Sequence, residues 1–292
     1  MELGRVGVWW GASWRSPDAA IDVPSELEHF RYGALWSSGG FEPGLAARFA
    51  RLLDATTHAV VASGIVSIWT TPADELATQV AGLEAANSGR FLLGLGASHG
   101  PLVPNYHRPF SQMVAYLDAL DAAPTPVPRH RRVLAALGPR MLELAGARAA
   151  GAHPYFVPVE HTARARGFLG PEPLLAPEVT VVLEEDPVAA RQRARAFTAG
   201  YLALPNYAEN LRALGYTDED MAGGGTDRLI DAVVAWGSVE AVADRVRSHL
   251  DAGADHVCVQ VLAGATFPLE EYRELAAALL PIMAEGPGSN PR

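Results

Sequence analysis

Short apolar runs alternate with helix-start signals along the whole chain, and this alternation restricts the fold more than any other feature. Eight runs are typical of buried strands, because they are short and rich in aliphatic, β-branched and aromatic residues. They lie at residues 6–10, 34–36, 59–68, 91–95, 133–137, 155–157, 179–183 and 257–262. Eight β-then-α units in a chain of 292 residues predict a single-domain (β/α)8 barrel over residues 1–292. A doubly wound open sheet is the alternative, because strand spacing alone does not show closure.

Capping residues mark the helices between these strands. Ser25 followed by Glu28 has the spacing of a capping box. Asp186, which precedes a proline, and Ser238 predict two further N-caps. Gly253 predicts the end of the helix that Ser238 begins.

One segment, residues 201–236, departs from the alternation. It adds helix-forming sequence and the three consecutive glycines at 223–225 before the last strand. We expect it to form a helical insertion, either a lid or an added helical layer. We also expect residues 285–292 to be a disordered tail.

The charge composition excludes several classes of function. The formal net charge is −10, and all 23 basic residues are arginines. Without a basic stripe we expect no nucleic-acid partner, because the surface repels phosphates. Without lysine, the chain cannot form a lysine Schiff base, hold pyridoxal phosphate through a lysine or build a Walker A loop. Arginines, hydroxyls and backbone N–H groups are left to bind a phosphate.

The apolar runs and the single cysteine point away from a membrane protein and from cysteine-based chemistry. The longest run, residues 58–69, is shorter than the roughly 20 residues that span a bilayer. Cys258 lies in a predicted strand and is interpreted as a core residue, and one cysteine allows neither an intramolecular disulfide nor a thiolate metal cluster. The start of the chain lacks the pattern of a signal peptide. We therefore expect a cytoplasmic protein without a membrane partner.

A first candidate site follows the fourth predicted strand, in the sequence GRFLLGLGASHGPLV. Gly94 and Gly96 begin like a dinucleotide fingerprint, but a proline-rich irregular stretch follows instead of a helix. In a barrel, Gly96, Ala97, Ser98 and His99 would lie at the carboxyl end of a strand, where catalytic residues gather. Small residues there would let a flat ligand approach the backbone.

A second candidate site follows the fifth predicted strand. Gly138 is placed at an N-cap, Pro139 in the first helical turn, and Arg140 and Met141 just inside the helix. Free N–H groups and a guanidinium at one helix start would bind an anion. An ordinary glycine-proline helix start with a solvated arginine is the equally simple alternative.

The order of motifs resembles a known family. GRFLLGLGASH, then VLAALGPRMLELAGARAAGAHPY, then WGSVEAVADRVRSHLDAGADHVCVQ, is similar to the luciferase-like monooxygenase superfamily, in particular to its branch that uses the deazaflavin coenzyme F-420. The similarity extends over about residues 5–283. It implies a (β/α)8 barrel with an insertion. It also implies a coenzyme phosphate at the turn 138–141, a ring system beside residues 96–98, and a non-proline cis peptide at Gly64 and Ile65 behind the ring.

The chain departs from the family where a histidine of the second strand would take part in proton transfer. Many members carry an aspartate-histidine pair after a tryptophan, whereas residues 36–40 read WSSGG. Ser37 and Ser38 would hydrogen-bond coenzyme or substrate there, or be solvated loop residues. His99 is the first candidate for a proton donor, followed by His153 and His107, although a histidine at a strand end is often structural.

The predicted function is hydride transfer between coenzyme F-420 and a small carbonyl, alcohol, imine or activated alkene. An FMN-dependent monooxygenase of the same superfamily is the first alternative. A non-catalytic coenzyme-binding barrel is the second. A metal-dependent hydrolase is disfavoured, because His153 and His161 lie on either side of a strand-to-helix turn and no H-x-H pair stands on the first strand. We expect no metal site, and the apolar face within residues 43–55 would permit a homodimer.

Overall fold

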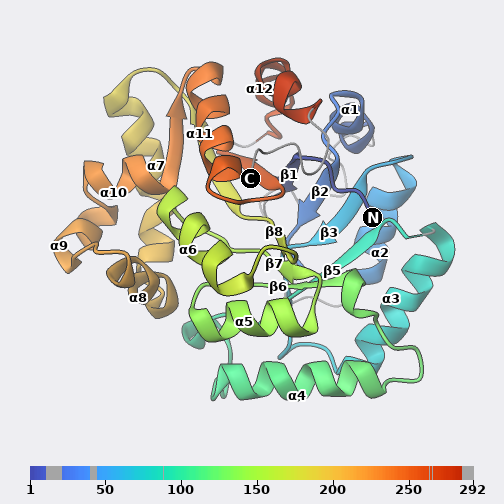
Figure 1. Cartoon of the computed structure of the whole chain (residues 1–292). Helices are drawn as coiled ribbons and strands as arrows, with labels where there is room; N and C mark the ends of the chain where they lie inside the picture. The colour runs from blue at the N-terminus through green and yellow to red at the C-terminus, as the bar shows by residue number, and fades with distance from the viewer. Residues whose placement is uncertain (11–21, 40–44, 88, 263, 265, 285–292) are drawn as a thin grey trace.

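The computed structural model describes residues 1–10, 22–39, 45–87, 89–262, 264 and 266–284. Gly40, residues 43 and 44, and the predicted tail at 285–292 lie outside these ranges. Parallel strands form a curled sheet that helices enclose (Figure 1).

The strands are β1 Val6–Trp10, β2 Ala34–Ser37, β3 Val60–Ser63, β4 Val66–Ser67, β5 Phe91–Gly96, β6 Arg132–Leu134, β7 Gly151–Ala152, β8 Leu174–Leu175, β9 Glu178–Leu183, β10 Val234–Gly237 and β11 Val257–Val261. The α-helices are α1 Val23–His29, α2 Leu45–Asp54, α3 Ala73–Asn87, α4 Pro109–Ala122, α5 Pro139–Arg148, α6 Val159–Leu169, α7 Pro187–Leu202, α8 Pro205–Ala213, α9 Asp218–Met221, α10 Asp227–Val233, α11 Val239–Asp251 and α12 Leu269–Met283.

The sheet closes on itself through the pair β8 and β9. β8 pairs with β7, and β9 pairs with β11, which leads back to β1. Two residues join β8 to β9: the Ala176 N–H donates to the Ala152 carbonyl at 2.9 Å, and the Pro177 carbonyl accepts from the Cys258 N–H at 2.9 Å. The barrel prediction is confirmed, and the open-sheet alternative is wrong.

Three of the predicted strands differ from the observed ones by more than one residue at an end. The run 59–68 is divided into β3 and β4 by the Gly64-Ile65 cis peptide. The fifth strand ends at Leu134 instead of 137. The sixth strand is Gly151–Ala152, not 155–157, and a proline at 154, which has no N–H for a ladder, separates the two segments.

Two predicted N-caps and the predicted C-terminal glycine are confirmed, and the predicted capping box is wrong. Asp186 accepts hydrogen bonds from the N–H groups of residues 188 and 189, and Ser238 accepts one from residue 241. Gly253 follows α11 with φ of +103°. Ser25 and Glu28 do not form a capping box, because α1 already begins at Val23. The Glu28 carboxylate instead accepts hydrogen bonds from the N–H groups of residues 57–59, at the start of the third strand.

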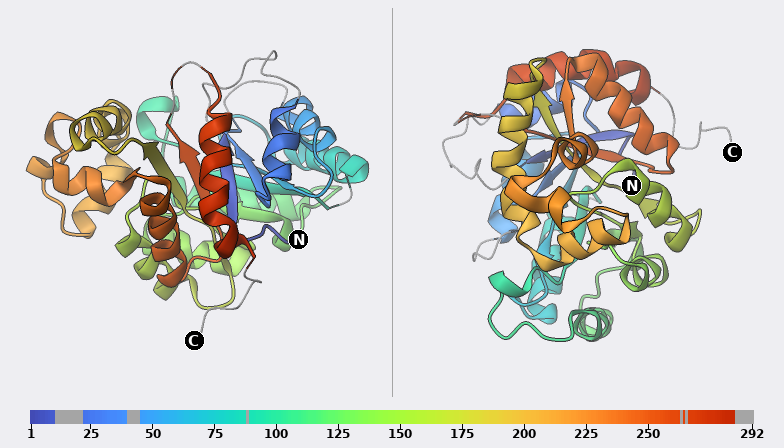
Figure 2. Two further views of the ribbon diagram at one scale, coloured as in Figure 1. Left: turned by 90° about the horizontal axis from the view of Figure 1, so that it is seen from above. Right: turned by 90° about the vertical axis from the view of Figure 1, so that its left-hand side faces the viewer.

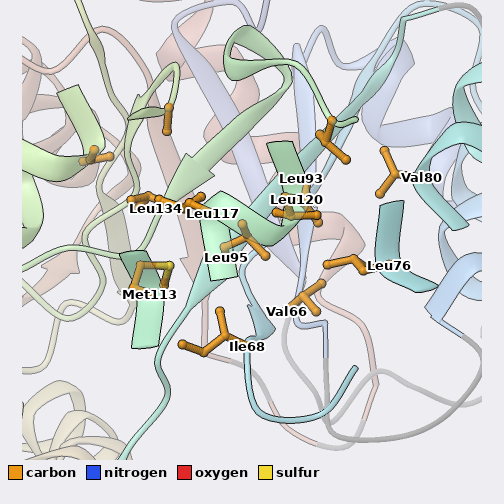
Figure 3. Packing of buried hydrophobic residues seen from close by; sticks show 14 of the residues in the cluster. Val66, Ile68, Leu76, Val80, Leu93, Leu95, Met113, Leu117, Leu120 and Leu134 are labelled. Atoms are coloured by element: carbon orange, nitrogen blue, oxygen red, sulfur yellow. The ribbon is translucent and has the colours of Figure 1, made fainter. Parts of the chain in front are cut away.

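Alternation along the strands separates an outer core from the barrel interior. Leu93 and Leu95 of β5 face outward and pack with Leu76 of α3 and with Leu117 and Leu120 of α4 (Figure 3). Intervening residues of the strands face inward. The interior cluster comprises Trp9, Ala34, Trp36, Val60, Ala62, Leu92, Val133, Ala176 and Cys258. Cys258 is fully buried, which agrees with its interpretation as a core residue.

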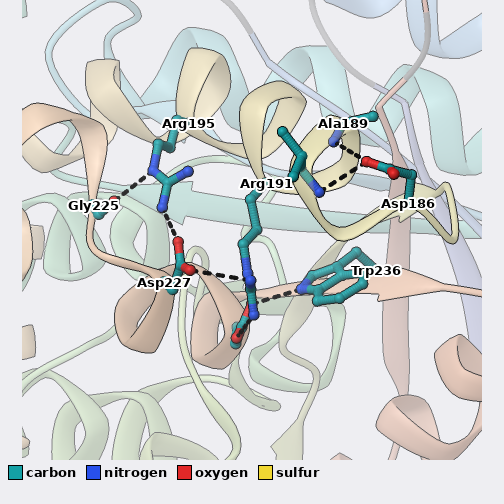
Figure 4. Close-up of polar contacts among 9 residues, drawn as sticks. Asp186, Ala189, Arg191, Arg195, Gly225, Asp227 and Trp236 are labelled. Carbon is teal, nitrogen blue, oxygen red and sulfur yellow. Dashed lines mark hydrogen bonds and ion pairs between the residues drawn. The ribbon is translucent and has the colours of Figure 1, made fainter.

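The segment 201–236 contains α8, α9 and α10, which lie together at one side of the barrel (Figure 2). It also contains most of β10, a strand that the sequence did not predict and that pairs with β9. Arg191 of α7 makes a bidentate ion pair with Asp231 of α10 at 2.9 and 2.6 Å, and Trp236 donates to the same carboxylate at 2.7 Å (Figure 4). Arg195 pairs with Asp227. These contacts fix the insertion to α7.

The apolar face of α2 is buried within this chain. Phe49 and Leu53 are both 0% exposed and belong to the core that surrounds β5. These two apolar residues of α2 therefore pack within this chain, and the possible homodimer stays a prediction.

Gly94 allows β3 and β5 to approach each other unusually closely. A Cβ atom at this position would lie 1.8 Å from the Ser63 carbonyl oxygen. We expect Gly94→Ala to lower the free energy of unfolding by about 3 kcal/mol, because two strands would have to separate. Urea denaturation at constant m-value measures this loss.

Gly82→Ala is the matched control. Gly82 lies on the exposed side of α3, and no atom lies within 4 Å of the position that an added methyl group would take. Its substitution is expected to raise stability by roughly 0.5–1 kcal/mol, because alanine favours helices. Equal effects of the two substitutions would contradict the close-approach explanation.

Candidate functional site

A cavity of about 420 Å³ opens at the carboxyl ends of the barrel strands. The end of β1, the link between β3 and β4, the segments that follow β5, β6 and β7, and the insertion all contribute to its wall. Among the described residues that line it, none is aspartate, glutamate or arginine. The cavity therefore suits an uncharged and largely apolar group.

The back wall is built around the Gly64-Ile65 cis peptide, which the family resemblance implied. The Ser63 hydroxyl accepts from the Gly94 N–H at 2.8 Å and donates to the Gly94 carbonyl at 3.0 Å. The Ile65 side chain lies against Gly96, where a Cβ atom would be 2.5 Å from its terminal methyl. The two glycines of the GLG motif thus make room for this wall, and no phosphate-binding turn is needed to explain them.

Trp9 and His153 form the inner end of the cavity. A Cβ at Gly64 would lie 2.7 Å from Trp9 Nε1 and 3.0 Å from His153 Nε2, so both ring edges adjoin this glycine. Within the described part of the chain, neither nitrogen has a hydrogen-bond partner. A donor and an acceptor are therefore left over at the inner end of the cavity.

The tautomer of His153 follows from its surroundings. Its Nδ1 lies 2.7 Å from the Ala176 carbonyl and must donate to it, which leaves Nε2 as an acceptor. The ring stacks on Trp36 with 4.3 Å between centroids. Burial lowers the pKa of His153 to about 4, against the opposing effect of the Ala176 hydrogen bond. A neutral His153 with its proton on Nδ1 could accept a hydrogen bond at Nε2 but has no proton there to donate, which argues against the role of proton donor.

His99 lies at the opposite end of the cavity, against the insertion. Ser98 has φ of +57°, a left-handed conformation that turns the chain sharply after β5. His99 Nδ1 is 2.8 Å from Asn206 Oδ1 of α8, and the ring lies 5.1 Å from that of Tyr207. Burial lowers the pKa of His99, while the bond to Asn206 acts in the opposite direction.

Tyrosines form the wall between these two ends. The Tyr155 hydroxyl donates to Gln260 Oε1 at 2.7 Å and lies 3.0 Å from the Tyr201 hydroxyl, which donates to it. Tyr207 packs edge-on against Tyr201 with 5.6 Å between centroids. Burial raises the pKa of Tyr155, Tyr201 and Tyr207, so their hydroxyls stay protonated at neutral pH.

The turn 138–141 borders the cavity. Gly138 is the N-cap of α5 with φ of −88°, and no atom lies within 4 Å of the position of a Cβ there. Its carbonyl accepts from the Met141 N–H at 3.2 Å. The exposed Arg140 guanidinium lies 4.1 Å from the centre of the Phe110 ring. A glycine is required here neither by backbone conformation nor by packing.

The structure brings most of the predicted site residues to this one cavity. Those that line it are Ser38, Gly64, Ile65, Ala97, Ser98, His99, Gly138 and Met141. Those that do not line it are Ser37, Gly96, Pro139 and Arg140. Ser37 is buried in β2 with its carbonyl accepting from the Gly64 N–H at 2.8 Å, and Gly96 supports the wall from behind.

Sequence reasoning missed the residues that the insertion contributes. The cavity is lined by Tyr201, Leu204, Asn206 and Tyr207. The sequence predicted only that the segment as a whole forms an insertion. His107 does not line it, because its Nδ1 donates to the Asn105 carbonyl in an exposed loop. For Asn206, the available signal was its place directly after the proline that starts α8.

No group of three metal-binding side chains occurs in the portion of the chain that the structure describes. His161 Nε2 donates to the Leu137 carbonyl at 2.9 Å, so it does not join His153 in a metal site. Among the helices that the structure describes, none is long and apolar enough to cross a membrane.

Comparison with known proteins places the chain in a family. The family model described as luciferase-like monooxygenase matches residues 103–256, more than half of the chain. The chain belongs to the luciferase-like monooxygenase family. Among the curated proteins, none matches the sequence.

Solved structures share the family fold at low sequence identity. An F-420-dependent secondary alcohol dehydrogenase in complex with an F-420-acetone adduct has a TM-score of 0.75 and 13% identity, covering 97% of this chain and 100% of its own. The F-420-dependent tetrahydromethanopterin reductase from Methanopyrus kandleri has a TM-score of 0.72 and 16% identity, with coverage of 96% and 99%. The FMN-bound oxygenating constituent of 3,6-diketocamphane monooxygenase from Pseudomonas putida has a TM-score of 0.67 and 15% identity, covering 98% of this chain and 99% of its own. Members with either coenzyme therefore share this barrel.

Four buried histidines make the stability of the fold depend on pH. Burial lowers the pKa of His153, His161 and His256 to about 4 and that of His249 to about 3. An unfolded histidine has a pKa of about 6.5, so the unfolded chain binds protons that the folded chain does not. The stability due to the neutral rings is complete above about pH 6.5 and is lost as the pH falls to about 4, by up to about 1.4 kcal/mol per pH unit for each ring.

Glu178 opposes this trend with one group against four. Burial raises its pKa to about 7, while hydrogen bonds from Thr180 and Phe156 lower it. Its contribution to stability is therefore complete below the unfolded pKa and is lost as the pH rises through 7.

We expect the melting temperature to fall steadily from pH 6.5 to 4.5, measured by calorimetry. His249→Gln should reduce the slope and His29→Gln, at an exposed position, should not. A melting temperature that does not change between pH 6.5 and 4.5 would contradict the burial of these histidines in neutral form.

Proposed function

We propose that this protein is an oxidoreductase that transfers a hydride between the deazaflavin coenzyme F-420 and a small uncharged organic substrate. The observation that carries the proposal is one continuous cavity that joins the cis-peptide wall to the open turn 138–141. An apolar slot beside a wall at one end and an anion-accepting helix start at the other suit a flat ring with a phosphate-bearing chain. Two of the similar structures are, by name, an F-420-dependent alcohol dehydrogenase and an F-420-dependent pterin reductase.

The residues present fit such a coenzyme. Ile65, Ala97 and Met141 offer apolar surface for the ring. The Trp9 N–H and His153 Nε2, which have no partner among the described residues, supply one donor and one acceptor, and the carbonyl and N–H edge of a deazaflavin can satisfy both. When bound, the coenzyme supplies or takes two electrons as a hydride, and the protein orients the reactants and excludes water.

The substrate end of the cavity has no formal charge. Leu102, Leu204, Tyr106 and Tyr207 line it together with His99. A charged reacting group would lose its hydration there without gaining an ion pair, so we infer a neutral substrate. Its carbonyl or hydroxyl would find the protonated tyrosines and His99 as hydrogen-bonding partners.

An FMN-dependent monooxygenase is the second candidate, because an FMN-bound member shares the barrel. Fluorescence titration of the apoprotein with F-420 and with FMN in parallel separates the two. Saturation by F-420 at concentrations where FMN does not bind is the expected result. Preference for FMN, with oxygen consumption in the presence of reduced flavin, would replace the proposal by the monooxygenase. Binding of F-420 without turnover of any neutral carbonyl or alcohol would indicate a non-catalytic barrel.

Substitutions in the turn 138–141 test the phosphate contact. Arg140→Ala should weaken F-420 binding by roughly 1.5–3 kcal/mol, through loss of a charge-assisted hydrogen bond. Gly138→Ala should leave the melting temperature unchanged, since no atom lies near the added methyl, and weaken binding roughly tenfold by blocking the anion. Titration of each variant gives its Kd.

Arg273→Ala is the control for the loss of one positive charge. Arg273 pairs with Glu270 on α12, and neither residue lines the cavity. The Arg273→Ala variant should bind F-420 with the same Kd as the unsubstituted protein. Equal affinities of Arg140→Ala and Arg273→Ala would remove Arg140 from the site.

A further inference from the structure

The contact between His99 and Asn206 connects the barrel to its insertion inside the cavity. His99 follows β5, whereas Asn206 is the second residue of α8, and both side chains line the same cavity. Asn206 Oδ1 is an acceptor, so the Nδ1 atom 2.8 Å away must carry the imidazole proton. The other ring nitrogen, Nε2, is then unprotonated in the neutral ring.

The backbone on both sides holds this contact in place. The left-handed turn at Ser98 orients the residue that follows it. On the other side, Tyr207 and Leu211 anchor α8, being 6% and 0% exposed. The His99 ring is also held against Tyr207. The turn after β5 and helix α8 therefore both hold the contact between His99 and Asn206 in place.

We propose that Asn206 is a positioning residue that keeps His99 in the Nδ1-protonated neutral form, so that His99 Nε2 accepts the hydroxyl proton of an uncharged alcohol substrate. This inference rests on the proposed function and specifies its direction and substrate class. It also gives the insertion a chemical role, because the proton acceptor is correctly formed only when α8 is docked.

The step balances with the oxidised coenzyme as the oxidant. The O–H bond of the alcohol breaks and its proton goes to His99 Nε2. The C–H bond at the same carbon breaks and its hydrogen leaves with the electron pair to the deazaflavin, while a C=O bond forms. His99 becomes an imidazolium and later returns its proton to solvent.

The neighbouring titratable groups favour this role. Tyr207 of α8 faces the His99 ring, and Tyr106 lines the same part of the cavity. Both phenols have a pKa raised by burial and stay neutral, so neither of them carries a charge that would favour the cationic form of His99. Burial keeps the pKa of His99 below its usual value, which leaves the acceptor form dominant at neutral pH.

Long-range ¹H–¹⁵N spectra of the histidine-labelled apoprotein test the pair without any coenzyme, with His99→Gln to assign the signals. The expected result is an unprotonated Nε2 in His99 at neutral pH. Asn206→Leu should reduce the population of that tautomer. Asn206→Asp should keep it and raise the pKa of His99 by about 1–3, because a carboxylate stabilises the imidazolium.

Asn210→Leu is the matched control, since Asn210 lies one turn further along α8 and its side-chain N–H₂ group has no hydrogen-bond partner among the described residues, His99 included. It should leave both the tautomer and the pKa of His99 unchanged. A protonated Nε2 in the unsubstituted protein would overturn the proposal. So would a tautomer population and pKa that Asn206→Leu does not alter.

Kinetics of the loaded enzyme test the direction of the reaction. With oxidised F-420 and a panel of uncharged alcohols, the rate should rise with pH through the pKa of His99 measured by NMR. Asn206→Asp should move the midpoint upward by the same amount as it moves that pKa. Failure to bind F-420 would overturn the proposed function and the alcohol step with it. Binding and turnover with an unshifted pH profile would overturn only the role of Asn206.

Discussion

The hydroxyl of Ser63 and the backbone of Gly94 form the contact on which the rest of the site depends. Ser63 bonds both the N–H and the carbonyl of Gly94, so strands β3 and β5 approach more closely than side chains would permit. At this point β3 ends, the cis Gly64-Ile65 bond follows, and Ile65 rests on Gly96. The same close approach that joins β3 to β5 therefore also builds the back wall of the cavity. A side chain at Gly94 would affect folding and site together.

The polar groups of the barrel interior are arranged so that the histidines there stay neutral. Trp36 donates to His256 Nε2 at 3.1 Å, while His256 Nδ1 donates to the Gly4 carbonyl at 2.8 Å. Trp36 also stacks on His153, whose own proton goes to a carbonyl. A neutral imidazole can be buried without a counter-ion when one nitrogen donates and the other accepts. Of these two rings, His153 lacks its second partner within the described residues, and that vacant acceptor lies at the inner end of the cavity.

The sequence was sufficient for the architecture but not for the details of the site. The strand and helix alternation predicted the barrel, since period and punctuation are local properties of the chain. The family motifs located the cis peptide and the turn 138–141. The strand at 155–157 was misplaced because the aromatic residues Tyr155 and Phe156 look like part of a buried strand. They are buried instead because they pack against Tyr201, which lines the cavity. Asn206 could not be assigned, because its partner His99 is 107 residues away in the chain.

The distribution of charge in the insertion agrees with the hydride-transfer site that we propose beneath it. Its aspartates 227 and 231 are used in ion pairs between α7 and α10, outside the cavity, where water still reaches them. Toward the cavity, the described residues of the same segment present tyrosine, leucine and asparagine. A fixed charge near the reacting carbon would favour either the hydride donor or its product and would retain water. With a neutral lining, the polarity of the site is set by a few oriented dipoles, and in the proposed reaction a protonated His99 would be the one charged side chain among the described residues that line the cavity.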